Sequence, residues 1–135
     1  MPAFRFLSAL LLTALATTPL PAKPLTVRMG ETWLFAVRHG APVDARKVAP
    51  ATPAATGQFK VSLQPMFGST MTISNASRFD YSYRATLVML TGKKGATKAC
   101  AVPAKGQTAI EHWTAAVAAV RLDRFKPAPA GSLCP

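Results

Sequence analysis

The chain contains two cysteines, Cys100 and Cys134, whose thiols could serve redox catalysis or form a structural bond. Redox-active pairs are typically spaced as C-x-x-C, and this spacing is absent. An even number of cysteines in an exported protein instead indicates a disulfide, and the N-terminal residues described below predict export. We therefore expect a Cys100–Cys134 bond that holds down the Pro- and Gly-rich tail at residues 126–131.

A second candidate for chemistry is the segment Leu-Phe-Ala-Val-Arg-His-Gly at residues 34–40, which places Arg38 and His39 at the end of an expected strand. It resembles the signature of the histidine phosphatase superfamily, in which the His accepts the phosphoryl group and the Arg binds phosphate. The resemblance covers seven residues and implies a small phosphate-ester hydrolase that uses Arg38 and His39. That family needs a larger α/β domain, and Ala41 stands where it usually has an acid or an amide, so we expect no enzyme.

Metal ligands and catalytic acids are too scattered to predict a site. Methionine and histidine bind copper in exported proteins, but here they form no M-x-M, H-x-M or M-x-x-M motif. Zinc would lack ligands once the cysteines are paired. The five acids are far apart in the sequence, and neither a G-x-S-x-G motif nor a Gly-rich phosphate loop occurs. We expect no metal, no other cofactor and no catalytic residue.

Positive charge is the strongest feature of the composition. The formal net charge is +11, and of the cations only Arg5 lies in the first 22 residues. Most Lys and Arg residues are scattered, which is typical of a solvated surface. Four lysines lie closer together around an expected hairpin turn at residues 91–95. As an alternative function, we consider a surface that binds a polyanion such as lipopolysaccharide or an acidic glycan through this group, whose members are Lys93, Lys94, Lys98 and Lys105.

Residues 1–22 have the pattern of a secretory signal peptide: a short basic start, an apolar run at 6–15 and a region of small residues. Cleavage is expected after Ala16 or Ala22. The apolar run is shorter than the roughly 20 residues of a membrane span. Neither cleavage point is followed by a cysteine, so we expect no lipoprotein anchor. The protein is thus expected in the periplasm or secreted, with no transmembrane segment in the mature chain and no nucleic-acid partner.

The remaining residues, 23–135, are enough for one domain, and their patterns predict β-strands. Strict alternation at residues 58–64 and 70–75 indicates strands with one buried and one solvated side. The Pro- and Ala-rich residues 50–57 predict a loop. Further strands are expected at 26–29, 32–38 (ended by His39, Gly40 and Pro42), 79–91 and 97–102, the last with Cys100 inside it.

The C-terminal part is harder to assign, because residues 108–119 are rich in alanine, which favours helix. We predict a turn or short helix at residues 111–113 and a last strand at 117–125. Whether residues 111–125 form helix or strand stays open from the sequence.

Seven or so short strands with turn signals predict a single antiparallel β-sandwich, immunoglobulin-like, with at most one short helix; a small barrel is the alternative. With its leader, the Gly-Glu-Thr-Trp at residues 30–33 and the terminal Cys134, the chain resembles small exported bacterial immunoglobulin-like β-sandwich proteins of unassigned function. The resemblance transfers no site residues. Our leading hypothesis is a non-enzymatic periplasmic binding or accessory protein, whose partner is an envelope protein or an anionic envelope polymer.

Overall fold

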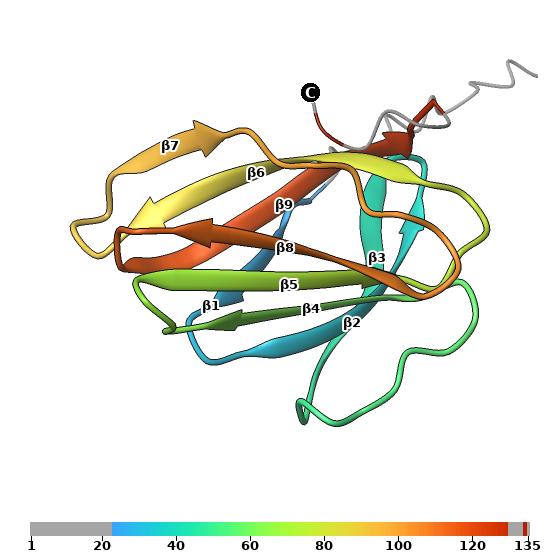
Figure 1. Ribbon diagram of the computed structural model, residues 1–135, viewed down its shortest axis with the longest axis horizontal. Helices are drawn as coiled ribbons and strands as arrows, with labels where there is room; N and C mark the ends of the chain where they lie inside the picture. Colours follow the sequence, from blue (N-terminus) through green and yellow to red (C-terminus); the bar gives the residue numbers. More distant parts are fainter. Residues whose placement is uncertain (1–22, 130–133, 135) are drawn as a thin grey trace, which may run out of the picture.

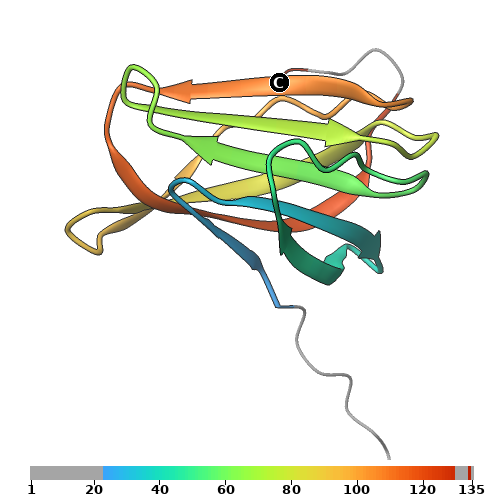
Figure 2. The same ribbon diagram turned by 90° about the horizontal axis from the view of Figure 1, so that it is seen from below.

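The computed structural model describes residues 23–129 and 134, which form β-strands and no helix. The strands are β1 (Leu25–Arg28), β2 (Thr32–Arg38), β3 (Ala41–Val48), β4 (Phe59–Gln64), β5 (Ser69–Asn75), β6 (Tyr81–Met89), β7 (Lys94–Thr97), β8 (Gln107–Trp113) and β9 (Val117–Pro127). They form two antiparallel sheets, with strand orders β1-β9-β6-β7 and β3-β2-β4-β5-β8. The sheets pack face to face (Figures 1 and 2), so the predicted β-sandwich is confirmed.

The strand order pairs the first strand of the chain with the last. Leu25 of β1 pairs with Leu122 of β9, so the first strand lies beside the last. In an immunoglobulin domain the first strand, A, lies beside the second, B. The described strands therefore show the two-sheet architecture of a β-sandwich, with a strand order different from that of an immunoglobulin domain.

Side-chain alternation decides which residues enter the core. In β4, Phe59, Val61 and Leu63 are buried, whereas the residues between them are only partly covered. β5 repeats this pattern with Met71 and Ile73. Successive side chains of a strand point to opposite faces, so this alternation places one face of the sheet against the second sheet. The sequence prediction for both strands is confirmed.

Aromatic rings fill the centre of the sandwich. The ring of Phe59 lies 5.3 Å from that of Phe35 and 5.3 Å from that of Tyr81, measured between centroids. Phe125 lies 5.7 Å from Phe59 and stacks on Tyr83 at 5.5 Å. Phe35 and Phe59 belong to the larger sheet, and the other three belong to the smaller one. These contacts therefore join the two sheets.

The prediction of a strand at residues 97–102 is wrong. β7 spans Lys94–Thr97, and the next residues follow an irregular path on which only Val102 pairs, in an isolated bridge with Tyr81. A polar contact explains the departure, because the amide of Cys100 donates a hydrogen bond to the Glu111 side chain instead of joining a sheet.

The prediction of a turn or short helix at residues 111–113 is also wrong, because these residues end β8. All seven residues of β8 pair with β5, from Gln107 opposite Asn75 to Trp113 opposite Ser69. This pairing outweighs the helical propensity of the alanines, which is worth only tenths of a kcal/mol per residue. The last strand is confirmed as β9, and it extends to Pro127.

β3 was not predicted from the sequence, because Pro42 was expected to end the strand before it. Pro42 pairs with Val37 inside β3. β3 is an edge strand of its sheet. Proline is tolerated on an edge because its nitrogen can face away from the ladder, where no donor is needed. Residues 38–41 therefore form a tight hairpin rather than the end of the structure.

Candidate functional site

The outer face of the β1-β9-β6-β7 sheet is rich in positive charge. Its cations are Arg28, Arg84, Lys94, Arg121, Arg124 and Lys126, which we call the cationic face. The only acid on the paired positions of this face is Asp123. Strand alternation places these cations outside, since Val27, Val120 and Leu122, the neighbours of Arg28 and Arg121, are buried in the core.

Strand register fixes the spacing of the cationic face. Arg28 lies opposite Ala119, Ala119 opposite Val88, and Val88 opposite Lys94, so Arg28 and Lys94 stand at the two edges of one row. Arg121 is two residues further along β9. Neighbouring strands are about 4.8 Å apart, so Arg28 and Lys94 stand about 14 Å apart, with the uncharged Ala119 and Val88 between them.

A β-bulge enlarges the charge of this face between β6 and β9. Ser82 pairs with Lys126 and Arg84 with Asp123, so β9 uses one residue more than β6 over this stretch. Arg124 has a φ of 53°, in the left-handed region that favours glycine. The extra residue lets Phe125 return to the core, while Arg124 is exposed.

The bulge borders a hollow of about 310 Å³ lined by Ser82, Tyr83, Arg84, Arg124 and Lys126. Arg84 grips Asp123 in a two-pronged ion pair, with Nε 2.8 Å from Oδ1 and an Nη 2.5 Å from Oδ2. The hydrogen bond to Asp123 raises the pKa of Arg84, so its guanidinium stays charged. Arg84 therefore neutralises the one acid of the face, and the positive charges of Arg124 and Lys126 remain in excess.

All five carboxylates of the chain are engaged in internal contacts. Glu31 accepts the Trp33 indole N–H, Asp44 pairs with Arg38, Asp80 accepts the Ala104 amide, Glu111 accepts the Cys100 amide, and Asp123 binds Arg84. Burial raises the pKa of Glu31, but hydrogen bonds from the Trp33 side chain and the Arg28 amide outweigh it and lower that pKa overall. The acids are thus occupied by contacts within the molecule, and within residues 23–129 and 134 no cluster of metal-binding side chains forms.

The structure divides the four lysines predicted to bind anions. Lys93 precedes β7, Lys94 begins it and Lys98 follows it, so these three lie along one edge of the sheet that carries the cationic face. The β6–β7 hairpin projects from one end of the sandwich in both views (Figures 1 and 2). The amide of Lys105 instead bonds to the Ser77 carbonyl, just before the start of β6. Lys105 therefore lies at the opposite end.

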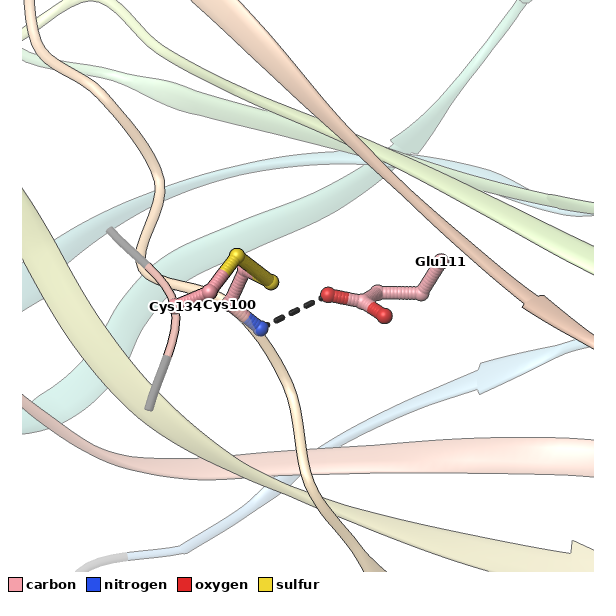
Figure 3. Close-up of a disulfide and its surroundings, with 3 residues drawn as sticks. All are labelled: Cys100, Glu111 and Cys134. Atoms are coloured by element: carbon pink, nitrogen blue, oxygen red, sulfur yellow. Dashed lines mark hydrogen bonds between the residues drawn. A yellow bond between two sulfur atoms is a disulfide. The ribbon is translucent and has the colours of Figure 1, made fainter.

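The predicted disulfide is confirmed. Cys100 and Cys134 are bonded, with their Cα atoms 4.3 Å apart. Cys100 lies in the connection between β7 and β8, and its amide donates to Glu111 of β8 over 2.7 Å (Figure 3). The bond therefore ties the C-terminal residue 134 to a segment that is itself anchored on the larger sheet.

The structure places Arg38 and His39 at the surface of the molecule. Both are exposed at the β2–β3 turn, and Arg38 makes a surface ion pair with Asp44 at 3.3 Å. His39 has a positive φ of 52°. The residues that the structure describes form two antiparallel sheets, and not an α/β domain of the kind that the phosphatase resemblance implies.

The second histidine is far from the first. Phe35 and Gln107 lie in one row across the larger sheet. His39 lies four residues beyond that row in one direction and His112 five residues beyond it in the other. At about 3.3 Å per residue, the two imidazoles are about 30 Å apart along the strands. His112 instead contacts the Phe67 carbonyl oxygen at 2.7 Å through Nε2.

Tyr83 combines a packed ring with an unpartnered hydroxyl. Among the residues that the structure describes, none forms a hydrogen bond with its buried hydroxyl oxygen. Burial raises the pKa of Tyr83 far above its usual value, and the nearby charge of Glu111 raises it further. The phenol therefore stays neutral in the folded protein at pH values where an unfolded tyrosine ionises.

We expect Tyr83→Phe to increase the free energy of unfolding by about 1 kcal/mol at pH 7, because it removes a buried hydroxyl without leaving a cavity. The pKa of Tyr83 is higher in the folded protein than in the unfolded chain. The wild type therefore loses no stability from this titration below pH 10, and it loses stability as the pH rises further because the unfolded tyrosine ionises first. At pH 10.5 the advantage of the variant should grow by about 0.8 kcal/mol. Urea unfolding of both proteins at the two pH values measures this, and an equal or smaller advantage at pH 10.5 would contradict it.

The cations of β9 were missed as site residues in the sequence analysis. A signal for them exists, since Arg121 and Asp123 alternate with the apolar Val120 and Leu122 within the expected strand. Arg28 and Lys94 belong to separate strands, and only the pairing brings them to one row.

None of the described residues form a helix long and apolar enough to cross a membrane. No protein family, no curated protein and no solved structure matches the chain.

Proposed function

We propose that this protein is a non-enzymatic binding protein of the bacterial envelope, in the periplasm or secreted, whose cationic face binds an anionic envelope polymer such as lipopolysaccharide or an acidic glycan. The observation that carries the proposal is the unequal use of the charges. The acids are engaged in internal contacts, whereas six cations and one neutralised acid share one sheet face.

The geometry of the cationic face supports a polymer better than a small ligand. The face is the outer surface of a sheet, and its cations follow the strand spacing from one edge to the other. A repeating anion can contact several such charges at once, and the weak contacts then add up. Export, expected from residues 1–22 and supported by the disulfide, would bring the face to envelope polymers.

Removal of three cations from the face should weaken binding strongly. The variant carries Arg28→Gln, Lys94→Gln and Arg121→Gln. At an anionic surface each Lys or Arg contributes about 1 kcal/mol, so the dissociation constant should rise roughly 100-fold. The measurement is binding of the oxidised protein to immobilised lipopolysaccharide and, in parallel, to polygalacturonate, over a salt series, because screening should weaken the wild type more steeply.

A matched control removes the same charge elsewhere. Arg46→Gln, Lys47→Gln and Lys105→Gln change exposed cations outside the cationic face. The loss of binding free energy in this triple variant should be less than about a fifth of the loss in the variant of the cationic face. Equal losses in the two variants would show that net charge alone drives binding and would refute a dedicated face. Absence of binding to both polymers by the wild type would refute the proposed function.

A further inference from the structure

The hollow at the bulge between β6 and β9 has features that a general charged surface does not need. Its bulge residue, Arg124, has a φ of 53°. At such a position glycine is favoured, because a side chain in left-handed backbone is strained. An arginine at this point therefore works against local stability, and strained positions of this kind cluster at functional sites.

The bulge changes which side chains face solvent. Lys126 lies opposite Ser82, and Phe125, the residue before it, is 3% exposed and packs in the aromatic core. If β9 alternated regularly after Asp123, without a bulge, Arg124 would point into the core and Phe125 toward solvent, because side chains alternate along a strand. The bulge thus brings the Arg124 side chain to the side that already holds Arg84.

The lining of the hollow matches a compact anion with two charges. Arg84, Arg124 and Lys126 carry three positive charges, and Asp123, held by Arg84, subtracts one. Arginine binds tetrahedral oxyanions with paired N–H donors, and lysine adds a point charge. The Ser82 hydroxyl donates a long, weak hydrogen bond of 3.4 Å to the Lys126 carbonyl oxygen. It can therefore turn toward a ligand.

We propose that this hollow binds the phosphate group of a phosphate monoester, which carries nearly two negative charges at neutral pH. The proposal rests on the proposed function, since it names the group of the envelope ligand that the cationic face recognises. The group could belong to a lipid headgroup at a membrane surface or to a soluble sugar phosphate. Both present the same dianionic phosphoryl group to Arg84, Arg124 and Lys126.

Arg124→Gly separates binding from folding. Glycine suits the left-handed backbone, so the variant should unfold at the same temperature as the wild type or higher. It removes one guanidinium from the hollow, so the affinity for phosphate should fall about tenfold or more. Arg124→Asn, which also tolerates positive φ, is a second variant with the same expected loss. Arg46→Gln removes one exposed charge on the other sheet, outside the cationic face, and should change the affinity less than about twofold.

The probes are glucose 6-phosphate, followed by NMR titration of the backbone amides, and vesicles that contain either phosphatidic acid, a phosphate monoester, or phosphatidylglycerol, a diester. Glucose 6-phosphate binding that is lost in Arg124→Gly supports the proposal for a soluble ligand. Binding confined to phosphatidic acid vesicles, and lost in the same variant, supports a lipid source.

Equal affinity of wild type and both Arg124 variants for these probes would overturn the proposal, as would binding of phosphatidylglycerol as tight as that of phosphatidic acid. If polymer binding still depends on Arg28, Lys94 and Arg121 in that case, the proposed function stands and only the phosphate site fails. Loss of both kinds of binding in the wild type would remove the proposed function as well.

Discussion

Replacing Phe59 by Ala is expected to lower the free energy of unfolding by about 4 kcal/mol. Phe59 is 1% exposed, and its ring contacts those of Phe35, Tyr81 and Phe125 from both sheets. The substitution removes buried apolar surface, leaves a cavity between the sheets and breaks three aromatic contacts. Since a domain of this size is stable by only about 5–15 kcal/mol, the loss is a large share of the total.

Urea unfolding followed by tryptophan fluorescence measures this loss. The matched control is Phe79→Ala, because Phe79 is 52% exposed and its substitution should change stability by about 0.5 kcal/mol or less. Phe59→Leu, which keeps most of the volume, should lie between the two. Similar losses for Phe59→Ala and Phe79→Ala would mean that the aromatic centre does not join the sheets as described.

Removing the disulfide should cause the second largest decrease in the free energy of unfolding. The bond links residues 34 positions apart, and in the chain-entropy model a loop of this length stabilises the folded state by about 3–4 kcal/mol. The double variant Cys100→Ser and Cys134→Ser should lose about this amount, because its unfolded chain regains the freedom that the bond removes. The double variant avoids the free thiol that a single substitution would leave.

Thermal and urea unfolding of the double variant, compared with the oxidised wild type, measures the effect. The wild type kept in reductant is the matched control and should unfold like the variant. Glu111 contacts the amide of Cys100 and not its sulfur, so this hydrogen bond should survive the substitution. A loss below about 1 kcal/mol would show that the tail is held by other contacts.

The charge distribution links the fold to the proposed function. In a strand, core and surface residues alternate, so each sheet of a sandwich offers one outward face to solvent. On the smaller sheet that face carries Arg28, Lys94 and Arg121 at paired positions. The bulge adds Arg124 to it at some cost in backbone strain. Backbone strain at Arg124 and concentrated positive charge therefore occur on the same outward face of the smaller sheet.

The sequence by itself determined the features that depend on neighbours along the chain. Alternation at residues 58–64 and 70–75 predicts strands and their buried faces, because the two-residue period of a strand is a local property. Two cysteines allow a single pairing, so the bond between Cys100 and Cys134 could also be predicted from the sequence. The prediction of a β-sandwich follows from many such short strands.

Only the tertiary structure decided the features that depend on strands far apart in the chain. Pro42 is compatible with a strand only because β3 is an edge, and residues 111–113 extend only because β5 pairs with them. The left-handed Arg124 arises from the register between β6 and β9, which no local pattern encodes. Lys105 left the predicted group and Arg28 joined the cationic face for the same physical reason: long-range pairing sets which side chains are neighbours, and propensity acts only over a few residues.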